Sequence, residues 1–231
     1  MHIKSVKFIM VLNIFCFITP IYSFANMNLC TKLINEKSQN QLKTNIDKSF
    51  AKLFAEPNIY LRAECEENVV RLYQAIKETH PNVSASDFKV LYIASKEFFR
   101  FKGVVSRTKV RTKKARYTYE DGQPSPVSFN HHVVLEYNGK IYDLEYTDKP
   151  VTPTIHDYFK GNFYSAEGII ADPKSKLDRD VPREDLDILV IKGEDYLNQS
   201  PREAAKLSFF EKLIDDGTPQ VPMLKYMESK K

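Results

Sequence analysis

The sequence predicts an α+β fold in which a helix packs on a central antiparallel sheet, and four stretches support this prediction. Residues 130–146 contain two apolar, β-rich runs on either side of Asn138-Gly139, the dipeptide most typical of a two-residue type I′ hairpin turn. Residues 66–79 carry apolar side chains at helical spacing and two glutamates in the first turn, which favours a helix. Residues 88–94 and 186–191 are apolar runs of strand length. We therefore expect one α+β domain.

The hairpin predicts which side chains share a face. Pairing outward from the turn sets His132 opposite Glu145 and Val134 opposite Asp143, and side chains alternate between faces along a strand. One face is nearly all apolar or aromatic and is interpreted as the core face. The other holds an imidazole and carboxylates on a face not required for packing. It comprises His132, Val134, Glu136, Ile141, Asp143 and Glu145.

The chain is expected to be exported. Residues 1–25 have a basic start, an apolar run at 8–18 that is too short to span a membrane, and a small-residue end, which predict a secretory signal peptide cleaved before Asn26. A retained membrane anchor is the alternative. Export would deliver the chain to the periplasm, to the extracellular medium or to a host cell. Removing Lys4 and Lys7 lowers the net charge of the 231-residue chain from +4 to +2, which favours no class of partner.

Sequence patterns divide the residues after the signal peptide into three segments. Residues 26–58 form a helical N-terminal extension, 59–215 the main domain and 216–231 a C-terminal tail. Within the domain, residues 155–163 are expected to form a short helix, 172–184 a polar loop, and 201–214 a helix that begins with a proline at its first position.

Residues 100–118 are strongly basic. Arg107, Lys109, Arg111 and Lys113 occupy alternate positions, so a strand here would have one cationic face. The simpler interpretation is a solvated edge strand that its charges protect from aggregation. The alternative is a docking surface for an acidic protein or an anionic surface. Nucleic acid is not expected, because no recognised binding module accompanies the segment.

Cys65 is the candidate nucleophile. It directly precedes the helix at 66–79, and a helix N-terminus and a neighbouring imidazolium can lower the pKa of a thiol from about 8.5 to roughly 3.5–7.5. A cysteine at a helix start, followed by His132 and Asp143 on adjacent strands, is the order that papain-like and transglutaminase-like hydrolases use. The alternative is a Cys30–Cys65 disulfide, since these are the two cysteines of the mature chain.

Three motifs resemble those of the protein N-terminal glutamine amidohydrolase family. They are Cys65-Glu66-Glu67-Asn68-Val69, His132-Val133-Val134-Leu135 and Ile141-Tyr142-Asp143-Leu144-Glu145. Pro150, Pro153, Tyr158 and Phe159 echo the family's loop and following helix, and the resemblance covers roughly residues 60–200. It implies a papain-like or transglutaminase-like fold, with Cys65 as nucleophile, His132 as general base, Asp143 as the orienting carboxylate, and no metal or organic cofactor.

The chain departs from the family pattern in several places. It has no tryptophan, whereas the family has an aromatic pair that includes tryptophan just before the histidine. Glu145 replaces the family's second aspartate and could share the role of Asp143, and Asn68 is a further candidate for support. His131 would replace His132 if the hairpin register shifted by one residue. The basic segment resembles an insertion.

These observations predict an exported cysteine amidohydrolase. It would deamidate N-terminal or exposed glutamine of a peptide or protein to glutamate, release ammonia through a thioester, and act as a monomer. One alternative is a papain-like protease or a transglutaminase-type acyltransferase. Another is a non-catalytic secreted binding module that uses the basic segment.

Overall fold

The structure is a computed structural model that describes Lys32, Glu36 and residues 40–42, 45–56, 64–104, 108–113, 127–146, 149–166 and 179–231. The signal peptide prediction, Cys30, Arg107 and the side chain of Arg111 lie outside the described residues. The chain divides into two compact units, Met1–Asn45 and Ile46–Lys231. Both sheets and the candidate site lie in the second unit. Among the described residues, no helix is both long and apolar enough to cross a membrane.

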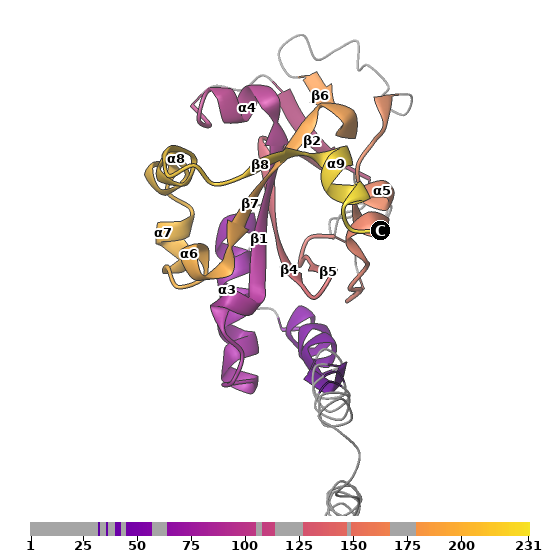
Figure 1. Cartoon of the computed structure of the whole chain (residues 1–231), viewed down its shortest axis with the longest axis vertical. Coiled ribbons are helices and arrows are strands. Elements are labelled where there is room, and N and C mark those ends of the chain that lie inside the picture. The colour runs from indigo at the N-terminus through magenta and orange to yellow at the C-terminus, as the bar shows by residue number, and fades with distance from the viewer. Residues whose placement is uncertain are drawn as a thin grey trace, which may run out of the picture. The chain divides into compact units, whose positions relative to one another are not determined.

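The fold contains both helices and strands and is built on a five-stranded antiparallel sheet, in agreement with the α+β prediction (Figure 1). The sheet has the order β5-β4-β1-β7-β8, and every neighbouring pair is antiparallel. Its strands are β1 (Phe88–Ser95), β4 (His131–Tyr137), β5 (Lys140–Tyr142), β7 (Leu186–Lys192) and β8 (Gln220–Pro222). The central position of β1 fits its sequence, because a strand paired on both sides and covered on both faces is apolar almost throughout.

The β4–β5 hairpin has the predicted turn and register. Asn138 and Gly139 both have positive φ, 49° and 76°, as the two central residues of a type I′ turn require. Leu135 pairs with Tyr142 and Glu136 with Ile141, which is the register expected from the sequence. The one-residue shift that would exchange the two faces is therefore absent from this hairpin.

Helices cover both faces of the five-stranded sheet. On one face α3 (Cys65–Thr79) packs its apolar side, and Tyr73 meets Phe88 edge to face at 5.5 Å. On the other face lie α5 (Ile155–Asn162) and α9 (Met223–Glu228), which contact each other (Figure 1). The hairpin face that holds His132 is therefore buried, and the prediction that packing does not require it is wrong. The covering helices bring tyrosine hydroxyls to its carboxylates, as described below.

The second unit, Ile46–Lys231, extends beyond the predicted domain of residues 59–215 at both ends. In the helix at residues 46–54, Phe50 is fully buried against Tyr142, and Asp47 accepts a hydrogen bond from the Tyr142 hydroxyl at 2.7 Å. At the other end, residues 216–231 form β8 and α9 rather than an open tail. Met223 is fully buried in the core.

The predicted helix at 201–214 is broken into α7 (Pro201–Ala204) and α8 (Leu207–Asp215). Lys206 has extended backbone angles between the two helices, although no glycine or proline stands there. Tertiary packing accounts for the break, because α8 directs Phe210 onto Tyr92 of the sheet at 4.5 Å between ring centroids. The remaining short helices are α4 (Lys96–Arg100), α6 (Gly193–Tyr196), η1 (Ala85–Asp87) and η3 (Arg183–Asp185).

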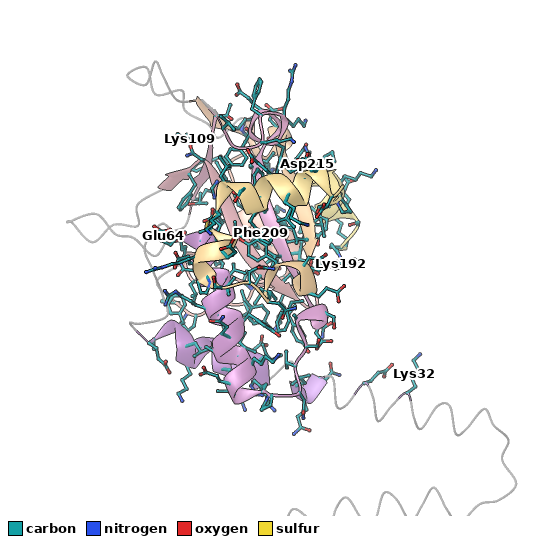
Figure 2. All side chains as sticks on the ribbon, turned by 90° about the vertical axis from the view of Figure 1, so that its left-hand side faces the viewer. Lys32, Glu64, Lys109, Lys192, Phe209 and Asp215 are labelled. Carbon is teal, nitrogen blue, oxygen red and sulfur yellow. The ribbon has the colours of Figure 1, made fainter. Side chains whose placement is uncertain are left out.

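The basic segment contributes the middle strand of a second sheet. This sheet has the order β3 (Val127–Phe129), β2 (Thr108–Thr112), β6 (Arg179–Val181), so β2 is not the edge strand that was predicted. Side chains alternate as expected: Val110 is fully buried, whereas Lys109 is half-buried and Lys113 is exposed. Lys109, labelled in Figure 2, donates to Asn130. Binding of an acidic partner by this face stays a prediction.

Candidate active site

Cys65 is the first residue of α3. Glu64, labelled in Figure 2, precedes it as the N-cap residue but makes no side-chain capping bond, and its carbonyl accepts the N–H of Asn68 at 2.9 Å. The first amides of the helix therefore have no side-chain cap from this residue, and the helix dipole favours a negative charge here. Cys65 carries a free thiol that is only 4% exposed.

The surroundings of the thiol oppose its ionisation. The thiol donates a hydrogen bond to the Glu66 carboxylate at 3.2 Å and also contacts the backbone of Val133, the residue that follows His132. Burial, then the negative charges of Glu66 and Glu145, raise the pKa of Cys65 well above its ordinary value, and the Val133 backbone lowers it only in part. The expectation of a lowered pKa is therefore wrong for this arrangement. Cys65 rests as a neutral thiol.

His132 and Asp143 form a buried pair. His132 Nε2 lies 2.9 Å from Asp143 Oδ2, and the two side chains are 1% and 4% exposed. The His132 ring also stacks on Phe129 at 5.1 Å between centroids. Burial lowers the pKa of His132, but the charge and hydrogen bond of Asp143 and the charge of Glu145 outweigh it, so the pKa is raised overall. Within the described part of the chain, Nδ1 makes no hydrogen bond.

Asp143 is itself held on two sides. The Tyr158 hydroxyl on α5 donates to Asp143 Oδ2 at 2.6 Å, and the backbone N–H of Glu145 donates to Oδ1 at 2.8 Å. The sequence places Tyr158 on the apolar side of its helix but does not indicate this bond. A carboxylate with two such donors keeps its orientation, and it therefore fixes which nitrogen of His132 carries the proton.

Glu145 connects the buried pair with α3. One carboxylate oxygen lies 3.7 Å from His132 Nδ1, and the other accepts the side-chain amide of Asn68 at 3.5 Å. Asn68 and Glu145 are both buried. The structure thus brings both candidate supporting residues to the site, with Glu145 beside the open nitrogen of the imidazole.

His131 takes part in a separate group on the opposite face of β4. Its Nε2 is paired with the Glu66 carboxylate, and its ring stacks on Tyr92 at 4.6 Å. One ligand atom each from Cys65, Glu66 and His131 lie within 4.8 Å of one another. The sequence did not predict that Glu66 contacts His131 and Cys65. An acidic residue in the first turn of a helix is favoured by the helix dipole, so Glu66 alone did not indicate a functional role.

The internal space at Cys65 is small. A cavity of about 10 Å³ lies between α3 and the hairpin and is lined by Cys65, Asn68, Val133, Asp143 and Glu145, among others. It can hold about one water molecule and is too small for a carboxamide. A substrate must therefore reach the thiol from another side or displace lining side chains. Of the six candidate residues, Cys65, Asn68, Asp143 and Glu145 line this cavity, His132 is paired with Asp143, and His131 is paired with Glu66. Lys109 belongs to the second sheet, and Lys113 directly follows its strand β2.

Comparison with known proteins adds no relative: no family model matches the chain, and no curated protein matches it.

Proposed function

We propose that the chain is a cysteine amidohydrolase that converts glutamine of a peptide or protein to glutamate. The observation that carries the proposal is the buried His132–Asp143 pair, whose imidazole Nδ1 makes no hydrogen bond to any described residue and whose strand contacts the thiol through the next residue, Val133. A nucleophile, a base and a group that orients the base are the three components of this chemistry. The papain-like or transglutaminase-like form of the α+β fold is part of the same proposal.

In the proposed reaction the proton of Cys65 passes to His132 Nδ1 while Sγ attacks the carboxamide carbon. The thiol must first leave the Glu66 carboxylate, to which it donates in the resting state. The imidazolium then protonates the departing nitrogen, ammonia leaves, and water hydrolyses the thioester to a carboxylate. Asp143 stabilises the imidazolium, and backbone amides at the start of α3 are the candidate donors to the oxyanion.

The first experiment incubates the mature protein with two peptides, one that begins with glutamine and one that holds glutamine internally, and follows the mass change. Wild type is expected to convert glutamine to glutamate and Cys65→Ala is expected to do nothing. Conversion of the first peptide alone indicates N-terminal specificity, and conversion of both indicates a general protein glutaminase. Cleavage of the peptide points to a protease, and no reaction with either peptide contradicts the proposal.

A second comparison identifies the base. His132→Asn is expected to lower kcat/KM by about 10²–10⁴-fold, because proton transfer by a positioned side chain contributes that much. His131→Asn is expected to cause a smaller loss. The matched control is Glu136→Gln, which alters a buried carboxylate on the same strand that accepts a tyrosine hydroxyl in α9. A larger loss for His131→Asn would assign the base to His131.

A further inference from the structure

We propose that Cys65, Glu66 and His131 form a binding site for a soft divalent cation of the zinc class, and that its occupancy prevents Cys65 from acting as a nucleophile. The second half of this statement rests on the proposed function, and the first half does not.

The geometry suits a small tetrahedral site. One candidate ligand atom from each residue lies within 4.8 Å of the other two. Tetrahedral zinc with ligand distances of about 2.0–2.3 Å requires ligand atoms about 3.3–3.8 Å apart. A separation at the 4.8 Å limit must shorten by about 1.0–1.5 Å to reach those values, and side-chain rotation can supply it. Three protein ligands leave a fourth position for water.

The ligand chemistry selects the class of cation. A thiolate, an imidazole and a carboxylate are the ligands that zinc and similar transition metals take, whereas magnesium and calcium prefer oxygen alone. Cys65 and Glu66 already contact each other at 3.2 Å, and Glu66 is already paired with His131. A cation would replace the protons that now bridge these groups.

The charge at this point also favours a cation. The Glu66 carboxylate lies 3.2 Å from the Cys65 thiol, and Glu145 lines the same small cavity as Cys65, so two carboxylates already lie near the thiol. When a dication binds, the Sγ–H bond breaks, the proton goes to solvent and an Sγ–metal bond forms, while His131 coordinates as the neutral imidazole with its one ring proton on the nitrogen that does not bind the metal. The thiolate and the Glu66 carboxylate then balance the two positive charges.

Burial and access are arranged as such a site requires. Cys65 is buried, whereas the side chains of His131 and Glu66 are 21% and 13% exposed, so a cation can enter from their side. Tyr92 and Phe98 flank the His131 ring at 4.6 and 5.1 Å and limit its movement. The His132–Asp143 pair lies on the other face of β4 and is not part of the group.

The test uses mature protein, reduced with a phosphine and freed of metal by a chelator that is then removed. Titration with Co²⁺ is expected to give a thiolate-to-cobalt charge-transfer absorption that saturates at one equivalent and is displaced by Zn²⁺. Cys65→Ser is expected to abolish the absorption, and Glu66→Gln and His131→Asn are expected to weaken binding at least tenfold. His132→Asn is the matched control and is expected to retain the absorption.

Thermal unfolding in chelator shows which variants are folded, and Glu66→Asp serves as a second variant because it keeps the carboxylate. Absence of the charge-transfer band in wild type overturns the site. An equal weakening by His132→Asn overturns the assignment of His131.

A separate measurement tests the blockade, that is, whether a bound cation prevents Cys65 from acting as a nucleophile. Zn²⁺ is expected to inhibit glutamine conversion by wild type at the concentration that displaces cobalt, and a chelator is expected to restore activity. Unchanged or increased conversion with zinc bound would overturn the blockade while leaving the site intact. If the protein converts no glutamine at all, the proposed function and the blockade fail together, and the cobalt titration still decides the metal site.

Discussion

Tyr158→Phe tests whether the support of Asp143 matters for chemistry as well as for stability. The change removes one hydroxyl from a fully buried ring and leaves the packing of the ring in place. The lost bond is the 2.6 Å donation to Asp143 Oδ2. Tyr226→Phe is the matched control, because its hydroxyl donates to the buried Glu136 carboxylate at 2.5 Å.

The two substitutions should differ in magnitude. A hydrogen bond to a charged group contributes about 1.5–3 kcal/mol, and Tyr158→Phe is expected to lie in the upper half of that range because Asp143 is buried beside His132. Tyr226→Phe is expected to cost about 1–1.5 kcal/mol, because Lys89 and Lys230 each remain 3.8 Å from the Glu136 carboxylate. Denaturant unfolding measures both free energies.

Enzymatic activity separates the role of the Tyr158 hydroxyl in stability from its role in positioning Asp143 for chemistry. Loss of one donor lets Asp143 rotate and misplaces His132, so Tyr158→Phe is expected to reduce kcat/KM about tenfold, equivalent to about 1.4 kcal/mol of transition-state stabilisation. Tyr226→Phe should stay within about twofold of wild type. The reasoning is refuted if both variants lose activity in proportion to their lost stability, or if Tyr158→Phe is destabilised yet fully active.

Three further predictions concern charge and packing. Because the pKa of His132 is raised, its imidazole stays protonated to a higher pH than usual, so kcat/KM should rise with pH through a midpoint above about 6.5. A midpoint at or below that value would contradict the assignment. Glu145→Gln removes a charge that raises the pKa of both His132 and Cys65, so it should lower this midpoint and speed alkylation of Cys65 at pH 7. Alkylation is followed by mass spectrometry with Glu136→Gln as control, and equal rates in the two variants would count against the electrostatic account. Gly193→Ala should destabilise the fold by about 2 kcal/mol or more in denaturant unfolding, because an added Cβ would lie 2.1 Å from a backbone oxygen. A change below about 0.5 kcal/mol would show that η1 and α6 separate easily.

Local signals in the sequence were sufficient for the regular elements that frame the site. The periodicity and acidic first turn of residues 66–79 predicted α3, and Asn138-Gly139 fixed both the turn and the register of the hairpin. Because register decides which residues share a face, the placement of His132, Asp143 and Glu145 on one face also followed from the sequence, whereas the choice of Asp143 as the partner of His132 came from the family resemblance. The short strand β6 was missed, because its three residues are largely polar and it is held by parallel pairing with β2.

Only the tertiary structure decided what surrounds those residues. Alternation along β4 places His131 and His132 on opposite faces but does not say which face meets α3, and helices from distant parts of the chain cover both faces. The neutral state of Cys65 likewise depends on Glu66 and on Glu145, which lies 80 residues away in the chain. Burial and electrostatics sum over neighbours in space, so the sequence determined the candidate groups, and folding decided their protonation and partners.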